Sequence, residues 1–324
     1  MNLEQFQSKG EKCQKQTQKG TQAKKISGGS IRLPAALAGL FGFKPSAGAS
    51  APASAADNDF LRLVSEGCVS RSVRDTDAYL AATAAEPRSI VGPGELRPLR
   101  IGVYSMSALG EEASPEGRAA VDEAAALCAS LGHRVEVVEG PRIRGERAAD
   151  AFFVVAGSSV RGLMELMTPM LGHPPGPGEL EPFTLALVAW ATELGPLALD
   201  EARRALEVQG ADLRAFLDGV DVALCPTWGG LRPALGHLAP HLPLDVLMAR
   251  TRALAGFTAG HNPAGAPSMS VPIGWTADGL PVGCQLAAAP GRDAMLMRLA
   301  YQLEAAAPWA HRWPPDQLGE NTNG

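Results

Sequence analysis

The feature that most constrains the fold is a strand, a helix and a second strand in direct succession. Residues 99–104, LRIGVY, form a short apolar strand, and residues 133–139, HRVEVVE, form a second strand of alternating character. The stretch between them, residues 114–132, is typical of a helix, because Ser114 can cap its start and Gly132 can end it. Such a βαβ unit predicts an α/β fold.

The rest of the body continues this mixture of strands and helices. An apolar strand, VDVALCP, is expected at residues 220–226. Two later strands, PSMSVPIGW and LPVGCQLAA, are joined by Asp278 and Gly279, which is a strong hairpin signal. Helices are expected over residues 151–172, 183–217, 244–259 and 292–307.

Composition excludes several classes of protein. The chain has 324 residues, of which 46% are hydrophobic and 19% charged, as in a globular protein. With a net charge of -5 we expect no nucleic-acid partner, and without an apolar run of about 20 residues we expect no membrane association. The five cysteines are odd in number and lack C-x-x-C spacing. We therefore expect free thiols in a reducing cytoplasm, with no disulfide framework and no metal site.

The first 25 residues differ from the body. Residues 1–25 contain six lysines and no arginine, whereas residues 26–324 contain one lysine, Lys44, and 22 arginines. No fold requires such a switch at one point in a chain. We interpret residues 1–25 as a non-homologous, disordered Lys/Gln-rich tail and residues 26–324 as one domain. A natural Lys/Gln-rich leader is the alternative.

The domain begins with Ser-Gly-Gly-Ser, residues 27–30. Two glycines let successive backbone N–H groups point at one spot, which suits the binding of an oxyanion. A hydroxyl just after such a turn can attack a carbonyl carbon, provided that a base takes its proton. Glycine-serine loops are common in proteins, so this motif alone is a weak signal.

The longer run GGSIRLPAALAGLFGFKPS, residues 28–46, resembles the signature of the amidase signature family of serine hydrolases. Residues 67–82, 221–227 and 262–289 also resemble segments of that family, so the resemblance extends from Ser27 nearly to the end. The ending EAAAPWAHRWPP resembles the branch that contains 6-aminohexanoate-cyclic-dimer hydrolase. The resemblance implies an α/β fold with a mixed β-sheet core, covered by α-helices on both faces.

The resemblance also implies the chemistry. The family cleaves amide bonds with a Ser–Ser–Lys triad, and its nucleophile maps to Ser30. The oxyanion hole maps to the backbone at Ser27, Gly28 and Gly29. Thr227 and Trp228 follow the late core strand, and we expect them at the substrate pocket. The implied substrate is a small linear or cyclic amide, with no cofactor, and a homodimer is compatible with this interpretation.

The chain also departs from the family pattern. The family's lysine base and its bridging serine would fall near or beyond the front of the chain, and Ile26 stands where the family has aspartate. Ser8 is close to the spacing of the bridging serine but lacks the flanking glycines. We therefore expect an N-terminally truncated relative, lacking the family's N-terminal part. It is either an impaired hydrolase or an inactive remnant that acts at most as a binding body.

Five other side chains are candidates for a replacement base. Lys44 occupies the Lys-Pro-Ser position of the signature, where a structural role is favoured. A histidine can accept a proton near neutral pH. The candidate histidines are His133, His237, His241 and His261, each of which is more often a loop histidine than a base.

Overall fold

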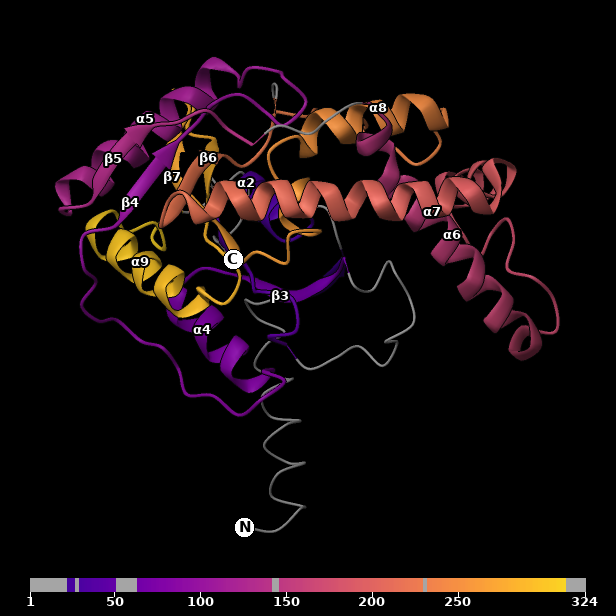
Figure 1. The fold of residues 1–324 in the computed structure, drawn as a ribbon, viewed down its shortest axis with the longest axis horizontal. Coiled ribbons are helices and arrows are strands. Elements are labelled where there is room, and N and C mark those ends of the chain that lie inside the picture. Colours follow the sequence, from indigo (N-terminus) through magenta and orange to yellow (C-terminus); the bar gives the residue numbers. More distant parts are fainter. Residues whose placement is uncertain (1–21, 27–28, 51–62, 142–145, 230–231, 313–324) are drawn as a thin grey trace, which may run out of the picture.

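The computed structural model describes residues 22–26, 29–50, 63–141, 146–229 and 232–312. In these residues the chain forms one mixed eight-stranded sheet with the order β1-β3-β2-β7-β8-β6-β4-β5 (Figure 1). β4 runs parallel to β5 and β6, and the other neighbours are antiparallel. The strands are Gln22–Ile26 (β1), Phe41–Lys44 (β2), Ser65–Ser70 (β3), Arg100–Val103 (β4), Arg134–Val137 (β5), Val222–Pro226 (β6), Ser268–Trp275 (β7) and Pro281–Ala287 (β8).

Helices lie on both faces of the sheet, as expected for this fold class. They are Arg32–Leu37 (α2), Val73–Ala82 (α4), Pro115–Ser130 (α5), Glu146–Leu171 (α6), Pro182–Asp218 (α7), Leu244–Ala255 (α8) and Asp293–Ala306 (α9), with a short 3-10 helix, Ala259–His261 (η1). Figure 1 shows α5, α9 and α4 on one side of the molecule and the long helices α6 and α7 on the other.

The βαβ unit forms as the sequence predicts, with β4, α5 and β5 in order. Ser114 accepts a hydrogen bond from the Gly117 amide at 3.1 Å, and Pro115 occupies the first turn of α5. Gly132 has a φ of 88°, which ends the helix in the conformation that glycine tolerates best. Parallel pairing of β4 with both β5 and β6 then places this unit at one edge of the sheet.

Strand β6 shows how the core is divided between the two faces. Successive side chains of a strand point to opposite faces. Val222 and Leu224 pack in the cluster that contains residues of α5 and α9, whereas Ala223 and Cys225 pack against Leu213 and other residues of α7. This strand is therefore buried on both faces, which explains its continuous apolar sequence.

The hairpin that Asp278 and Gly279 predict is confirmed between β7 and β8. Gly279 has a φ of 78°, and the turn is closed by a hydrogen bond from the Thr276 amide to the Leu280 carbonyl at 2.9 Å. These two strands lie in the middle of the sheet and pair with β2 and β6. They carry the segments that connect the sheet to the candidate site.

Residues 1–25 were expected to be disordered, but the structure places residues 22–25 in strand β1. Its backbone, Gln22–Ile26, pairs antiparallel with β3, with Gln22 opposite Val69 and Ile26 opposite Ser65. The edge of β3 offers unpaired backbone groups, and an adjoining segment can satisfy them whatever its origin. The expectation for residues 1–21 lies outside the described residues.

Helices α6 and α7 pack against each other and carry exposed apolar side chains. The segments Ala149–Leu171 and Pro182–Asp218 are long and apolar enough to cross a membrane by length and composition alone, which the sequence analysis did not anticipate. A mostly buried core helix of a globular protein passes the same test, but only 33% of the first apolar window and 17% of the second are buried here. Here α7 buries residues including Leu206 and Leu213 against the body. It bends where Gly195 leaves the helical conformation before Pro196.

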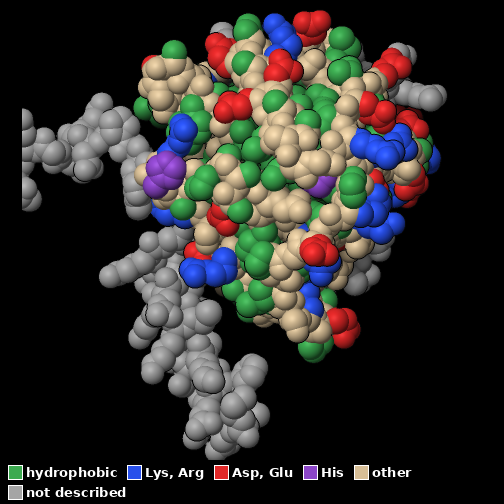
Figure 2. All heavy atoms as spheres, turned by 90° about the vertical axis from the view of Figure 1, so that its left-hand side faces the viewer, with side chains coloured by type: hydrophobic (Ala, Val, Ile, Leu, Met, Phe, Trp, Pro, Cys, Tyr) green, Lys and Arg blue, Asp and Glu red, His purple; other side chains and the backbone are tan. Residues whose placement is uncertain are grey.

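The opposite side of the molecule, near α5, β5 and α9, has a mixed surface. Figure 2 shows acidic, basic and apolar side chains interspersed over this face. Its ion pairs include Arg97 with Asp221 at 2.5 Å and Arg100 with Glu136 at 2.9 Å. Such exposed pairs add little stability, so the fold depends on the apolar clusters on the two faces of the sheet.

Candidate active site

Ser30 lies in a turn directly before helix α2, at the wall of a large cavity. The residue is partly exposed, but its Oγ is buried and has no hydrogen-bond partner among the described residues. The cavity has a volume of about 210 Å³. A buried hydroxyl without a partner is uncommon in folded proteins and suggests a functional role.

The backbone at Gly29 fixes the position of this turn. Gly29 has a φ of 126°, which side-chain-bearing residues rarely adopt. A Cβ at this position would overlap the Thr258 hydroxyl and would lie 2.9 Å from Leu33 Cδ1. The Gly29 carbonyl accepts a 2.7 Å hydrogen bond from the Leu33 amide, which ties the turn to α2. Only glycine fits here without a shift of the surrounding chain.

Ser27, Gly28 and Gly29 are predicted to form an oxyanion hole, and the structure describes only Gly29 of these three residues. Gly29 is buried beside Ser30, in a conformation that suits a backbone nest. Ser27 and Gly28 lie outside the described residues, so their role stays a prediction.

Arg32 holds the elements around Ser30 together. Its guanidinium is 1% exposed and donates to Gln285 Oε1 at 2.6 Å, to the Thr258 carbonyl at 3.0 Å and to Asn262 Oδ1 at 2.9 Å. Burial lowers the pKa of Arg32 to about 9, so it stays charged at neutral pH. No carboxylate pairs with it among the described residues. A positive charge therefore lies buried two residues after Ser30.

The same network continues through the amides that Arg32 contacts. Asn262 Nδ2 donates to the Leu63 carbonyl at 2.7 Å, and Gln285 Nε2 donates to the Phe257 carbonyl at 2.8 Å. Since Asn262 and Leu63 both line the large cavity, Arg32 positions part of the cavity wall as well as the start of α2. The sequence alone does not indicate a site role for these amides, because the hydrogen-bond partners are more than 190 residues apart in the chain.

The large cavity is mainly apolar. Side chains from α2, α6, α7 and α8 form most of its wall, and its polar groups include Ser30, Gln209 and Asn262. Arg252 lies at the same wall and is paired with Asp150. The apolar members include Leu33, Leu63, Phe152, Phe153, Leu206 and Leu254. Apolar walls with a few polar groups are typical of small-molecule sites.

This cavity wall was not predicted from the sequence. The side chains come from helices that were predicted as helices only, and each segment taken alone has the pattern of ordinary core packing. One signal was available in the sequence. The α6 and α7 segments contain more apolar residues than a single buried helix face requires.

Thr227 and Trp228 do not line the Ser30 cavity. Thr227 is fully buried, and its Oγ1 lies 3.0 Å from Ser270 Oγ. Trp228 is 5% exposed and packs in the main core cluster with Leu254. The structure therefore places both residues in the interior. They follow a strand that is buried on both faces, which directs them into the core.

The candidate replacement bases are not among the residues that line the Ser30 cavity. Lys44 is buried on β2, where its Nζ donates to the Pro45 carbonyl at 2.9 Å and contacts Ser65 Oγ at 3.4 Å. Burial, followed by the charge of Arg32, lowers the pKa of Lys44 to about 7, and Asp293 opposes this shift. Lys44 is not among the residues that line the Ser30 cavity.

The four candidate histidines also do not line the Ser30 cavity. His133 accepts from the Leu99 amide at 3.2 Å and lies 3.1 Å from Gln302 Oε1, which is a structural arrangement. His237 and His241 do not line the Ser30 cavity. His261 is 2% exposed and lines a second, smaller cavity next to it. Among the described residues, no group of three or more His, Cys, Asp or Glu could hold a metal ion.

Comparison with known proteins identifies the family of this chain. The family described as Amidase matches residues 27–297. "Putative amidase AmiC" of Mycobacterium bovis (strain ATCC BAA-935 / AF2122/97) is 35% identical over 307 residues, covering 89% of this chain and 62% of that relative. The 6-aminohexanoate-cyclic-dimer hydrolase of Pseudomonas sp. (strain NK87) is 30% identical over 313 residues, covering 88% and 63%. The chain therefore spans a little over three fifths of the length of these curated relatives.

The solved structures agree. The structure of 6-aminohexanoate cyclic dimer hydrolase superposes with a TM-score of 0.80 and 26% identity, covering 91% of this chain and 66% of that one. The match to the family begins at residue 27 and includes Ser30 and the Arg32 network. Sequence and fold therefore lead to one conclusion: this chain belongs to the amidase signature family.

Proposed function

We propose that Ser30 is the nucleophile of an amide hydrolase that acts on small amides with an apolar acyl group. The observation that carries this proposal is the buried Ser30 Oγ, without a hydrogen-bond partner in the described chain, at the wall of an apolar cavity of about 210 Å³. Relatives whose names describe amidases and a hydrolase of a cyclic amide support this class of reaction.

The proposed chemistry is acyl transfer in two steps. Ser30 Oγ attacks the amide carbonyl carbon, and the negative charge that forms on the carbonyl oxygen is held by backbone N–H groups of residues 27–30. The C–N bond then breaks, and the amine leaves with the proton lost by Ser30. Water next attacks the ester carbon, the bond to Ser30 Oγ breaks, and a carboxylic acid is released as Oγ regains a proton.

The cavity wall supports a substrate with an apolar acyl part. A relative named for the cyclic dimer of 6-aminohexanoate handles amide bonds that are separated by runs of methylene groups. Leu33, Phe152 and Leu206 would surround such a run here. Each buried methylene favours binding by about 0.8 kcal/mol. We therefore propose that linear or cyclic amides with methylene chains bind better than acetamide.

We also propose that turnover by this chain is impaired. Nucleophilic serines are activated by an adjacent base. Among the described residues, no base contacts Ser30 Oγ, and Lys44 and His133 are held elsewhere by their own hydrogen bonds. The second candidate function, an inactive amidase-like binding body, rests on this same observation. Either function suits a small-molecule partner in the cytoplasm, where the free thiols of Cys68, Cys128, Cys225 and Cys284 would remain reduced.

Labelling with a fluorophosphonate, read by intact mass, separates the two functions. The parent protein, Ser30→Ala and the surface control Ser130→Ala are treated side by side. One adduct on the parent and on Ser130→Ala, with none on Ser30→Ala, supports the nucleophile. If none of the three labels, the hydrolase proposal is wrong, and equilibrium binding of hexanamide then tests the binding body. If the parent protein can be labelled, its unlabelled form is then assayed for hydrolysis of hexanamide and of acetamide. The ratio of the two rates measures the preference for an apolar acyl group.

A further inference from the structure

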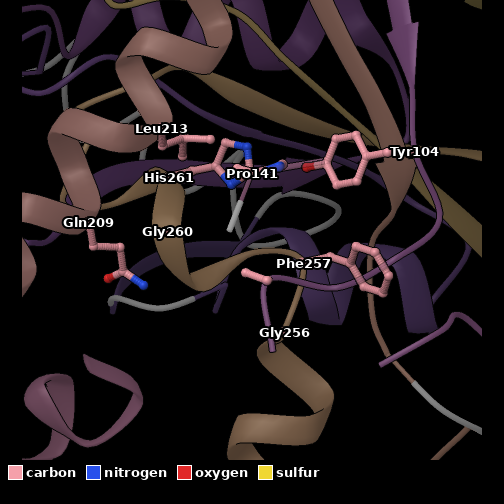
Figure 3. Close-up of a pocket in the computed structure, with 9 residues that line it drawn as sticks. Tyr104, Pro141, Gln209, Leu213, Gly256, Phe257, Gly260 and His261 are labelled. Atoms are coloured by element: carbon pink, nitrogen blue, oxygen red, sulfur yellow. The ribbon is translucent and has the colours of Figure 1, made fainter. Parts of the chain in front are cut away.

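A second cavity adjoins the one that holds Ser30, and its size suits a single water molecule. Its volume is about 20 Å³, against the roughly 10–15 Å³ that one water requires. Figure 3 shows the ring of His261 and the hydroxyl of Tyr104 pointing toward each other across it, with Pro141 between them in this view. The side chain of Gln209 enters from α7. No substrate acyl group could fit in this space.

The two cavities share their walls along three segments. In α7, Leu206 lines the large cavity, Leu213 lines the small one, and Gln209 lines both. In the segment after α8, Ala255 lines the large cavity and Phe257 the small one. Gly256, which lies between these two residues in the sequence, lines both.

The third segment, around η1, contributes residues to both cavities. Ala259 and Asn262 line the large cavity, whereas Gly260 and His261 line the small one. Since the outer members of the small cavity include the partly exposed Ala108 and Pro141, the small cavity extends from near the surface toward the Ser30 cavity.

The chemistry of the small cavity favours a neutral ligand. His261 is 2% exposed, and neither ring nitrogen has a partner in hydrogen-bond geometry among the described residues. Burial, together with the charges of Arg32 and Lys44, lowers the pKa of His261 well below its usual value, and the Thr258 backbone only partly opposes this. A neutral imidazole offers one donor and one acceptor, which are the groups that a water needs.

Nothing in the lining supplies a negative charge. The lining includes no aspartate or glutamate. Burial, followed by the nearby Cys225 thiol, raises the pKa of Tyr104 well above its usual value, so its hydroxyl stays neutral. The nearby charges of Arg32 and Lys44 would repel a cation. The volume of the small cavity, its neutral polar groups and the nearby positive charges therefore all favour water as its ligand.

We propose that this cavity is a water-binding passage that supplies the hydrolytic water to the Ser30 ester, with His261 as the residue that positions it. The inference rests on the proposed function. An apolar acyl group that fills the large cavity excludes water from that side, yet the ester can be hydrolysed only if water reaches its carbonyl carbon. In that step the water oxygen bonds to the acyl carbon, the bond to Ser30 Oγ breaks, and one water proton passes to Oγ.

Gly260→Ala is the variant that tests the passage. A Cβ at Gly260 meets only Leu213 Cδ2, at 3.5 Å, which is ordinary contact, so the methyl group narrows the cavity without a clash. Ala108→Val narrows it from another wall, and His261→Leu removes the ring nitrogens. Gly162→Ala is the matched control, because a Cβ at Gly162 meets nothing within 4 Å and this residue lines neither cavity.

The acyl-enzyme is loaded with p-nitrophenyl hexanoate, freed of excess reagent, and its loss is followed by intact mass. Loading reports acylation of Ser30, and loss of the adduct reports attack by water. We expect unchanged loading and a roughly tenfold slower loss in Gly260→Ala, Ala108→Val and His261→Leu, which corresponds to about 1.4 kcal/mol in the barrier. Gly162→Ala should match the parent in both rates. A purely structural role of Gly260 or His261 would reduce loading as well.

The outcomes separate the two proposals. If the parent loads and all variants lose the adduct at the parental rate, the passage is wrong and the nucleophile stands. If Ser30 does not load, the proposed function fails. A high-resolution crystal structure tests the site independently of activity: we expect an ordered water against the His261 ring in the parent and its loss in Gly260→Ala. Absence of that water from the parent overturns the passage, whether or not Ser30 is acylated.

Discussion

At the scale of single residues, Gly29 is the position where the backbone leaves the least freedom. We predict that Gly29→Ala destabilises the protein by about 1–3 kcal/mol, because its φ of 126° and the overlap with the Thr258 hydroxyl both oppose a side chain. It should also lower the rate of Ser30 labelling. Urea denaturation measures the first effect, with Gly162→Ala as the control in open space. Equal stability of the two variants would mean that the turn is not held as the structure shows.

Lys44 gives a pH dependence whose sign is fixed by its lowered pKa. In the folded protein its pKa is about 7, whereas an exposed lysine titrates near 10.4. Between these values the unfolded chain binds one more proton than the folded chain. The contribution of Lys44 to the free energy of unfolding therefore rises with pH, by up to about 1.4 kcal/mol per unit.

We predict that Lys44→Met flattens the stability curve between pH 7 and pH 9 and stabilises the protein most at pH 7. Urea denaturation at several pH values measures this. The conservative variant Lys44→Arg should flatten the curve as well, because a guanidinium that stays protonated in both the folded and the unfolded chain adds no pH dependence over this range. Unlike Lys44→Met, it should not stabilise the protein at pH 7, because a positive charge remains buried. A parent curve that falls over this range, with the same slope in Lys44→Met, would contradict the assignment.

At the scale of elements, the α6–α7 pair has an apolar face without a partner among the described residues. Met170 is 85% exposed and Leu197 is 78% exposed. We predict that Met170→Gln and Leu197→Gln change the free energy of unfolding by less than about 0.5 kcal/mol and reduce self-association. Leu187→Gln, at a position 6% exposed on the same helix as Leu197, should destabilise by about 3 kcal/mol. Urea denaturation and light scattering measure the two properties.

The elements themselves could largely be predicted from the sequence, and the reason is local. The α5 helix is delimited by Ser114 and Gly132, and the β7–β8 hairpin by Gly279, so short-range rules suffice. Strand β1 was missed because its pairing with β3 is a long-range backbone contact that its Lys-rich composition does not indicate. The bend of α7 at Gly195 and Pro196 was visible in the sequence, but whether the helix continues beyond it depends on packing against α6.

The candidate site was predictable only where it lies within one segment. Ser30 and Gly29 belong to a single short motif, so the sequence indicates them directly. The partners of Arg32 come from residues 258–285, and the cavity wall comes from several helices far apart in the chain. Thr227 was placed at the pocket because it follows a strand end, but a doubly buried strand directs it into the core.

At the scale of the whole molecule, the packing predicts an uneven distribution of local stability. Strands β7 and β8 are buried along nearly their whole length and pair on both sides, so their amides should exchange with solvent only by global unfolding. The end of α6, where Leu166 is 74% exposed, has few buried contacts and should open locally. Hydrogen exchange read by mass spectrometry should therefore show rapid exchange in residues 163–171 and the slowest exchange in β7.

This gradient bears on the proposed function, because α6 and α7 form much of the cavity wall while Arg32 and β8 anchor the Ser30 turn. Hexanamide bound in the large cavity should slow exchange around Phe152 and Phe153, which line it. It should leave β7 unchanged, since that strand already exchanges at the global limit. Ser30→Ala should show the same protection, because the cavity binds the acyl group without covalent chemistry. Protection confined to the α5 and α9 side would place the ligand elsewhere and exclude this cavity as its site.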